Sequence, residues 1–189
     1  MLKKELIIIA GPNGSGKTTF AKSFLKEFNH EFLNADEIAK ELTGKGKSAG
    51  NISAGKEYFK RIEKLKMNQK NIILESTLSG LFLEKLIHDF KKKKYAIKIL
   101  FIVLNSAEIC IERIKHRVSR GGHYVPDMDV RRRFERGKEN FWNRYKQIVD
   151  SWMLYNNTES GFELVAIGEG NKFDITNETL FNNFKENIK

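Results

Sequence analysis

A glycine-rich segment near the start of the chain carries the strongest chemical signal. It reads GPNGSGKTT, and its first eight residues match the pattern G-x-x-x-x-G-K-[S/T]. Glycines at this spacing let backbone N–H groups wrap around phosphate oxygens at the start of a helix. Lys17 would reach the β- and γ-phosphates of a nucleotide, and the Thr18 hydroxyl would be a ligand of Mg²⁺. The predicted nucleotide-binding residues are Gly11, Pro12, Asn13, Gly14, Ser15, Gly16, Lys17, Thr18 and Thr19.

Two acidic residues that follow predicted strands are candidates for contact with a second substrate. Asp36, in NADEIA (Asn34–Ala39), fits two roles. It could be the N-cap of the helix that follows, or a carboxylate that takes a proton from an acceptor hydroxyl. Glu75, in LEST (Leu74–Thr77), ends an apolar strand, where a carboxylate is costly unless it meets a metal, a cation or a donor. We expect Glu75 to contact the substrate or a Mg²⁺-bound water rather than to serve structural hydrogen bonding alone.

The most apolar strand of the sequence lacks an acidic residue at its end. The run IKILFIVLNS closes with Asn105 and Ser106, whereas a regular Walker B strand closes with an acid. This ending argues against a large mechanical ATPase. It favours a compact kinase whose metal is held mainly by Thr18 and the nucleotide.

Arginines are concentrated in one part of the chain. Eight of the nine lie between residues 113 and 144, around the segment RVSRGGHYVP at Arg117–Pro126. Arg113 and Arg117 share a helical face before the glycine pair, and a second arginine-rich helix follows it. Taken alone, the segment predicts either a basic helix pair exposed to solvent or nucleic acid, or a lid. Beside GPNGSGKT the lid is favoured, because arginines that close over a transferring phosphoryl group stabilise its charge and exclude water.

These motifs are separated by alternating strands and helices. The expected strands are Glu5–Ala10, Glu31–Asn34, Asn71–Leu74, Tyr95–Leu104 and Phe162–Ile167. The expected helices are Gly16–Phe28, a short one from about Glu37, Ala54–Gln69, Leu81–Phe90, Ala107–Val118, Asp127–Val149 and one from Asn177 onward, with a loop at Lys45–Gly50. Such alternation predicts a mostly parallel sheet with ligands beyond the carboxyl ends of its strands. We expect an α/β fold of the P-loop NTPase or kinase type, with three αβα layers and a helical, arginine-bearing lid.

Composition limits the class of protein. The chain has 189 residues, 40% of them hydrophobic, which suits one domain over residues 1–189. The longest apolar run, Leu6–Ala10, is too short for a membrane span, and no signal-peptide pattern is present. The lone Cys110 fits a small buried hydrophobe in a reducing compartment, so we expect a cytoplasmic protein. The net charge of +10 suits phosphate-rich small substrates, and without an interleaved aromatic platform nucleic acid is a less favoured partner.

Together the motifs resemble the zeta-toxin family of P-loop kinases. The matching runs are GPNGSGKTT, NADEIA, LEST and RVSRGGHYVP, followed by V-x-R-R-F-x-R at Val130–Arg136, Asn140, Phe141 and YNN at Tyr155–Asn157. The resemblance implies a kinase that uses ATP or GTP with Mg²⁺. Its implied acceptor is a UDP-activated amino sugar, typically UDP-N-acetylglucosamine at the sugar 3′-hydroxyl, and its implied partner is a protein antitoxin.

The resemblance also implies roles for individual residues. Lys17 and Thr18 would handle the phosphates and Mg²⁺, and Asp36 would be the base. Acceptor contacts would come from Asn34, Asp36, Glu75 and Thr77, and the lid and transition-state clamp from Arg117, Arg120 and Arg133.

Two other functions stay open at this point. One is a kinase of the same fold that acts on another hydroxyl, such as that of a different nucleotide sugar or of a polynucleotide end. The other is a non-catalytic nucleotide-binding regulator. A regulator would not need Lys17, Asp36 and the lid arginines together.

Overall fold

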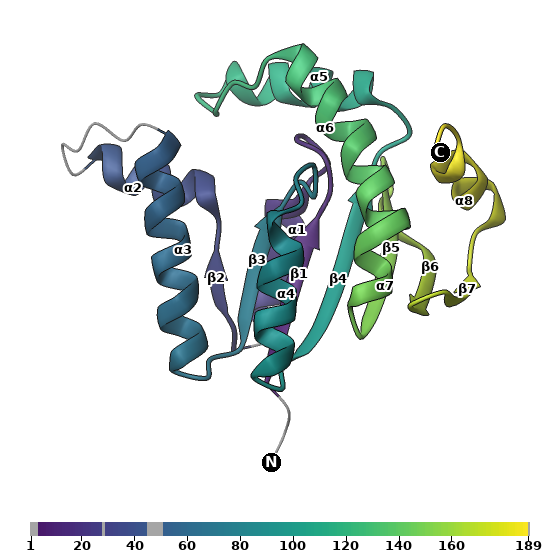
Figure 1. The fold of residues 1–189 in the computed structure, drawn as a ribbon. Coiled ribbons are helices and arrows are strands. Elements are labelled where there is room, and N and C mark those ends of the chain that lie inside the picture. The colour runs from purple at the N-terminus through teal and green to yellow at the C-terminus, as the bar shows by residue number, and fades with distance from the viewer. Residues whose placement is uncertain (1–3, 28, 45–50, 189) are drawn as a thin grey trace.

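A computed structural model describes residues 4–27, 29–44 and 51–188. The loop expected at Lys45–Gly50 lies outside these residues. Within them, seven strands form one sheet in the order β2-β3-β1-β4-β5-β6-β7 (Figure 1). The strands are β1 (Glu5–Ala10), β2 (Glu31–Leu33), β3 (Ile72–Ser76), β4 (Ala96–Val103), β5 (Ser151–Thr158), β6 (Gly161–Glu169) and β7 (Lys172–Ile175).

The first five strands along the chain are parallel to one another. β1 lies between β3 and β4, β2 pairs with β3, and β5 pairs with β4. The last two strands, β6 and β7, extend this sheet in antiparallel fashion. The mostly parallel sheet predicted from the sequence is confirmed. Its central strand β1 runs directly into the glycine-rich segment, so the carboxyl ends of the neighbouring strands surround that segment.

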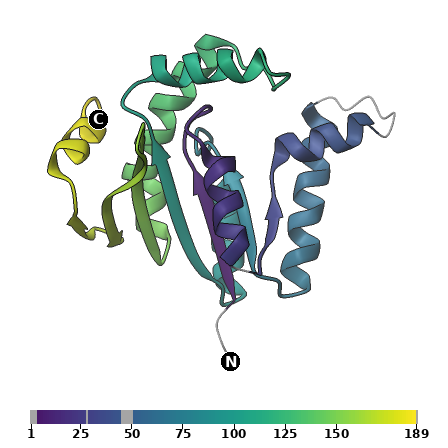
Figure 2. The same ribbon diagram turned by 180° about the vertical axis from the view of Figure 1, so that it is seen from behind.

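Helices cover both faces of the sheet, as the predicted αβα layers require. They are α1 (Lys17–Glu27), α2 (Ala35–Gly44), α3 (Asn51–Met67), α4 (Phe82–Lys92), α5 (Ala107–Val118), α6 (Asp127–Asn140), α7 (Lys146–Ile148) and α8 (Glu178–Lys185). Figure 1 shows α3, α4 and α7 in front of the sheet, and Figure 2 shows α1 in front of it from behind. None of the described helices is long and apolar enough to cross a bilayer.

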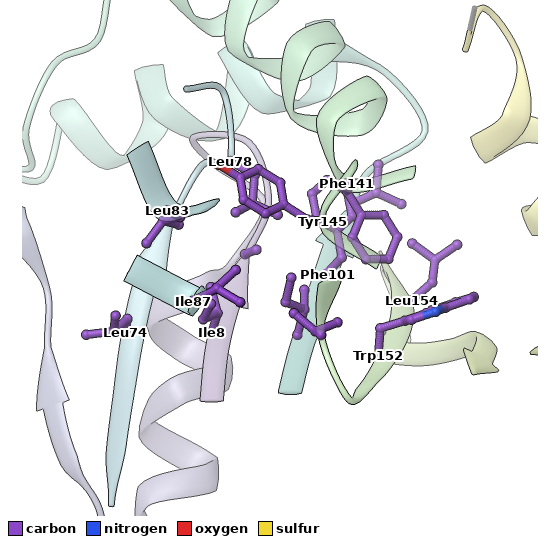
Figure 3. Close-up of a cluster of buried hydrophobic side chains, with 14 of the residues drawn as sticks. Ile8, Leu74, Leu78, Leu83, Ile87, Phe101, Phe141, Tyr145, Trp152 and Leu154 are labelled. Carbon is purple, nitrogen blue, oxygen red and sulfur yellow. The ribbon is translucent and has the colours of Figure 1, made fainter. Parts of the chain in front are cut away.

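The two faces of the sheet bury cores of unequal size. Alternate side chains of β1 enter them: Leu6 and Ile8 pack into the larger core, and Ile7 and Ile9 into the smaller core against α1. Figure 3 shows part of the larger core, where Ile8 lies near Leu74 of β3 and Ile87 of α4. Burial of this apolar surface is the main force that fixes the strands beneath the motifs.

The two arginine-rich helices α5 and α6 cross above the carboxyl ends of the strands (Figure 1). α5 has the predicted bounds, whereas the single helix predicted over Asp127–Val149 is interrupted by a π-helical turn at Phe141–Tyr145. The turn adds a residue to the helical repeat and buries both Phe141 and Tyr145. Phe141 stacks on Phe101 of β4 with ring centroids 4.5 Å apart and planes 8° apart. Tertiary packing therefore decides this interruption, which helical spacing alone does not reveal.

Candidate active site

The glycine-rich segment forms a phosphate-binding loop between β1 and α1. Gly14 and Gly16 have φ angles of +83° and +92°, which side chains other than glycine rarely adopt. A Cβ on Gly14 would lie 2.6 Å from the Cys110 carbonyl oxygen, and one on Gly16 would lie 2.5 Å from Asn157 Nδ2. The loop thus fits closely against α5 on one side and β5 on the other. Cys110 is buried, as predicted, and burial raises its pKa to about 12.

Lys17 is almost completely buried at the start of α1. Its Nζ donates to the Pro12 carbonyl at 2.9 Å and lies 3.8 Å from Glu75 Oε1. Burial lowers the pKa of Lys17 from its ordinary value of 10.5, and the negative charge of Glu75 partly opposes that shift. A buried ammonium held in this way is ready to meet an anion with little loss of hydration.

Glu75 connects three elements at the carboxyl end of β3. Its Oε2 accepts hydrogen bonds from Thr18 Oγ1 at 2.8 Å and from Asn34 Nδ2 at 2.7 Å. β4 is followed by Asn105 and Ser106, with no acid at its end. In the structure the acid beside Thr18 comes from β3, the other neighbour of β1, and Glu75 pairs in register with Ile9.

The oxygens of Thr18 and Glu75 fit a Mg²⁺ site. A hydroxyl and a carboxylate are hard oxygen ligands, and Mg²⁺ is usually bound by one or two carboxylates together with substrate phosphates. Among the described residues, no group of three or more His, Cys, Asp and Glu side chains could hold a metal. A metal that arrives with a nucleotide would take further ligands from phosphate oxygens and water.

Asn34, not Asp36, is the N-cap of α2. Its Oδ1 accepts from the backbone N–H groups of Asp36 at 2.7 Å and Glu37 at 3.1 Å. The capping role considered for Asp36 is therefore wrong, because the helix begins two residues earlier than that role requires. Asp36 is exposed, and its carboxylate accepts no hydrogen bond from the described residues. It is free to act on a ligand.

Two cavities meet beside Asp36. The smaller has a volume of about 190 Å³ and the larger about 510 Å³. The smaller is lined by Gly14, Gly16, Thr18, Thr19, Arg113 and Arg117, the larger by Asn34, Ala35, Gly55, Tyr58, Phe59, Ser76, Thr77, Phe82 and Arg133, and both by Asn13, Lys17, Asp36 and Glu75. A group in the larger cavity can therefore face a phosphate in the smaller one across a shared set of charged side chains.

Three other residues of the predicted nucleotide site, Gly11, Pro12 and Ser15, make contacts that hold the loop in place. The Pro12 carbonyl accepts from Lys17, and the Ser15 carbonyl accepts from Asn157 Nδ2 at 2.9 Å. Gly11 lies so close to β4 that a Cβ would overlap the Ile102 carbonyl oxygen. None of these three lines either cavity.

The three predicted lid arginines are placed differently. Arg117 lines the smaller cavity, and its Nη2 donates to the His123 carbonyl at 2.7 Å across the lid turn. Arg133 lines the larger cavity, and its Nη1 donates to Asn13 Oδ1 at 3.1 Å. Arg120 is exposed on the turn after α5 and lines neither cavity. The geometry thus brings two of the three to the site.

Arg113 and Asn157 belong to the site although neither was assigned a role from the sequence. Arg113 lines the smaller cavity, and its Nη2 donates to the Asn157 carbonyl at 3.4 Å. Asn157 in turn braces the Ser15 carbonyl. The spacing of four between Arg113 and Arg117 and the YNN run at Tyr155–Asn157 were the available signals. Neither the spacing nor the YNN run predicts that β5 and α5 meet at the phosphate loop.

The loop after β3 is held from behind by α6 and the π turn. Asn140 Nδ2 donates to the Leu78 carbonyl and Tyr145 OH to the Gly80 carbonyl, each at 2.7 Å. Leu78 is buried with a φ of +53°, and its N–H donates to Ser76 Oγ at 3.1 Å. Thr77 lies in the same loop and faces the larger cavity, where its Oγ1 is 2.8 Å from Ser79 Oγ.

Comparisons with known proteins agree with this architecture. The sequence profile of a family described as an AAA domain (AAA_33) matches residues 6–141. A cytidylate kinase of Archaeoglobus fulgidus is 27% identical over 159 residues, which cover 79% of this chain and 82% of that protein.

Two solved structures share the fold. The AvrRxo1-ORF1:AvrRxo1-ORF2 complex with sulphate ions superposes with a TM-score of 0.77 at 16% identity, covering 96% of this chain and 63% of that one. This chain therefore spans less than two thirds of that protein. The PezAT chromosomal toxin-antitoxin system of Streptococcus pneumoniae gives a TM-score of 0.68 at 20% identity, covering 91% and 75%.

Proposed function

The chain belongs to the AAA domain family, and on that premise we propose that it is a P-loop kinase of a small molecule. It transfers the γ-phosphate of ATP or GTP to a hydroxyl group. The observation that carries the proposal is the position of Asp36, at the junction of the two cavities together with Lys17 and Glu75. A donor phosphate in the smaller cavity and an acceptor in the larger cavity meet at a carboxylate that makes no structural hydrogen bond to the described residues.

Different residues of the site bind the donor phosphates, hold the metal and activate the acceptor. Backbone N–H groups of the phosphate loop and the ammonium of Lys17 bind the β- and γ-phosphates. Thr18 and Glu75 would hold Mg²⁺, which neutralises phosphate charge when bound. Asp36 orients the acceptor hydroxyl and takes its proton as the new O–P bond forms. The bond from the γ-phosphorus to the β,γ-bridging oxygen breaks, and the nucleoside diphosphate leaves.

The lid arginines stabilise the charge that develops during transfer. Arg117 reaches the smaller cavity and Arg133 the larger one, so one guanidinium lies on each side of the transferring group. Positioned cations in a site closed to water lower the barrier to phosphoryl transfer. Arg117 would exchange its bond to the His123 carbonyl for one to phosphate.

For the acceptor we favour a UDP-activated amino sugar. The motifs that resemble the zeta-toxin family support this choice, as does the fold shared with the PezAT structure. The larger cavity, at about 510 Å³, falls within the range that holds a ligand of this size. A protein antitoxin remains a proposal that rests on the same resemblance. ATP as the donor is supported by a structure of the AvrRxo1 complex that contains it.

A nucleoside monophosphate is the second candidate acceptor, because a relative of similar sequence is a cytidylate kinase. A phosphate acceptor needs cations to bind it but no base. The larger cavity presents Asp36 and Glu75 beside Lys17 and Arg133, which favours a hydroxyl acceptor.

A panel of acceptors tests the proposal. The protein is incubated with labelled ATP and, in separate reactions, with UDP-sugars, CMP, nucleosides and oligonucleotides. We expect label on a UDP-amino sugar. Asp36→Asn should reduce that transfer by about 10²–10⁴-fold while the affinity for ADP stays unchanged. Glu37→Gln, an exposed neighbour on the same helix that lines neither cavity, is the matched control. Undiminished turnover of Asp36→Asn would refute the assignment of the base.

A further inference from the structure

Two exposed aromatic rings line the larger cavity. Phe59 of α3 is 43% exposed and Phe82 of α4 is 49% exposed. Their ring centroids lie 5.6 Å apart with planes at 86°, an edge-to-face pair. Neither ring lines the smaller cavity, so the pair belongs to the acceptor side alone.

Packing against the core does not account for this pair. The buried face of α3 is formed by Tyr58 and Ile62, and Phe59 lies one position round the helix from Tyr58. Large apolar groups left in water are unfavourable, and when they gather in a cavity they mark a place where a ligand binds. The same cavity is also lined by Asp36 and Arg133. The rings are therefore continuous with the residues proposed to handle the acceptor.

Gly55 supplies a separate observation. It lies four residues before Phe59 on α3 and lines the same cavity, without a positive φ. A Cβ added there would meet no described atom within 4 Å. Glycine is a poor helix former, and neither the backbone nor a close neighbour requires it here. Its value at this position is the open space that it leaves beside the two rings.

We propose that Gly55, Phe59 and Phe82 form a subsite for a nucleobase of the acceptor. A base is flat, and aromatic side chains stack on any base because each presents a π-face. Arg133 in the same cavity suits a phosphate of such a molecule. The inference rests on the proposed kinase function and deepens it, because it names the side chains that select an acceptor with a base over a free sugar or polyol.

A fluorescent variant tests the contact without any turnover. Phe59→Trp places an indole in the cavity, and wild-type protein supplies the background of the two native tryptophans, Trp142 and Trp152. Titration with UMP or UDP-N-acetylglucosamine should quench the new fluorescence. N-acetylglucosamine 1-phosphate, which has no base, should not quench it at the same concentration. ADP alone should leave it unchanged, because the donor occupies the smaller cavity.

Steady-state kinetics provide the second test. Phe59→Ala and Phe82→Ala should each raise KM for the base-containing acceptor by about 10-fold, with little change in kcat and none in ADP affinity. Gly55→Ala should raise that KM as well, although the helix itself becomes more stable. Met67→Ala is the control, since Met67 is an exposed apolar residue of the same helix outside the cavity, and it should leave KM unchanged.

The outcomes separate the subsite from the proposed function. Unchanged KM in both phenylalanine variants, or quenching by ADP as strong as by UMP, overturns the subsite. Equal quenching by UDP-N-acetylglucosamine and by N-acetylglucosamine 1-phosphate, which lacks the base, also overturns the subsite. Quenching by the base-containing compounds in a protein that phosphorylates none of them supports the subsite and rejects the kinase proposal.

Discussion

The two cavities are built in opposite ways. The smaller cavity is shaped by backbone, and glycines there are crowded: a Cβ on Gly14 or Gly16 would come within 2.6 Å of neighbouring atoms. The larger cavity is shaped by side chains, and its Gly55 faces open space. Phosphate has the same shape in every nucleotide, so a fixed backbone serves it well. An acceptor varies from one enzyme to another, and side chains on helices can change with it while the loop stays constant.

The largest effect that separates the two sides is expected from Lys17→Ala. Removal of the buried ammonium takes away a phosphate ligand and leaves Glu75 without its cation, so kcat should fall by about 10³-fold. ADP binding should weaken in parallel, whereas binding of a non-reactive acceptor to the larger cavity should change little. Calorimetry with each ligand measures the difference. Lys22→Ala, an exposed lysine of the same helix, should behave as wild type.

The glycine contrast is next in size and is tested by thermal or urea unfolding. Gly14→Ala combines a φ of +83° with a Cβ 2.6 Å from a carbonyl oxygen, so the free energy of unfolding should fall by about 3 kcal/mol. Gly55→Ala should raise it by about 0.5–1 kcal/mol, since alanine favours the helix. The two changes in the free energy of unfolding should differ in sign, and their sizes need not match. A loss of stability in Gly55→Ala would break the comparison.

A smaller effect is expected from Asn157→Ala. The side chain of Asn157 braces the phosphate loop by donating to the Ser15 carbonyl, and an unpaired carbonyl costs about 1–2 kcal/mol. KM for ATP should rise about 10-fold, with KM for the acceptor unchanged. Asn182→Ala, on the exposed face of α8, is the control. Equal increases in both KM values would show that β5 supports the whole site and not the donor side alone.

The weakest test is the pH dependence of binding. The pKa of Lys17 lies below 10.5 because of burial, and only the protonated form attracts phosphate. ADP affinity should therefore fall as pH rises through this lowered pKa, while Lys17→Arg keeps its affinity over the same range. The aromatic subsite contains no group that loses a proton there. Burial, with a contribution from Glu75, raises the pKa of the neighbouring Tyr58. Acceptor binding should therefore depend on the protonation of Lys17 less strongly than ADP binding does.

Local signals allowed much of the donor side to be predicted. β1 and α5 have the bounds expected from the sequence, because each is a short apolar or amphipathic run with clear ends. The phosphate loop follows β1 directly, so its residues needed no long-range information. β5 was missed for a physical reason: its buried positions include Asn156 and its less buried ones include Met153 and Tyr155. Burial of the side chains alternates along β5, but apolar and polar residues do not alternate in its sequence.

The acceptor side could not be predicted in the same way. No interleaved aromatic platform is visible in the sequence, yet Phe59 and Phe82 meet because α3 and α4 pack on the same face of the sheet. The role of Asn34 as N-cap depends on where α2 begins, which propensity does not fix to one residue. Because no acid follows β4, the metal was expected to be held mainly by Thr18 and the nucleotide. Only the strand order shows that β3 also borders β1, which places Glu75 beside Thr18.

The loop after β3 shows how a binding site can be made ready before its ligand arrives. A leucine in the left-handed region costs about 1–2 kcal/mol, yet Leu78 is held there by its burial and by two hydrogen bonds. Its carbonyl accepts from Asn140 Nδ2, and its N–H donates to Ser76 Oγ. Gly137 of α6 approaches so closely that a Cβ would lie 2.7 Å from the Thr77 carbonyl oxygen. The entropy of ordering this segment is therefore lost once, during folding. An acceptor that binds beside Thr77 meets a wall that needs no further ordering, and more of its contact energy remains as affinity.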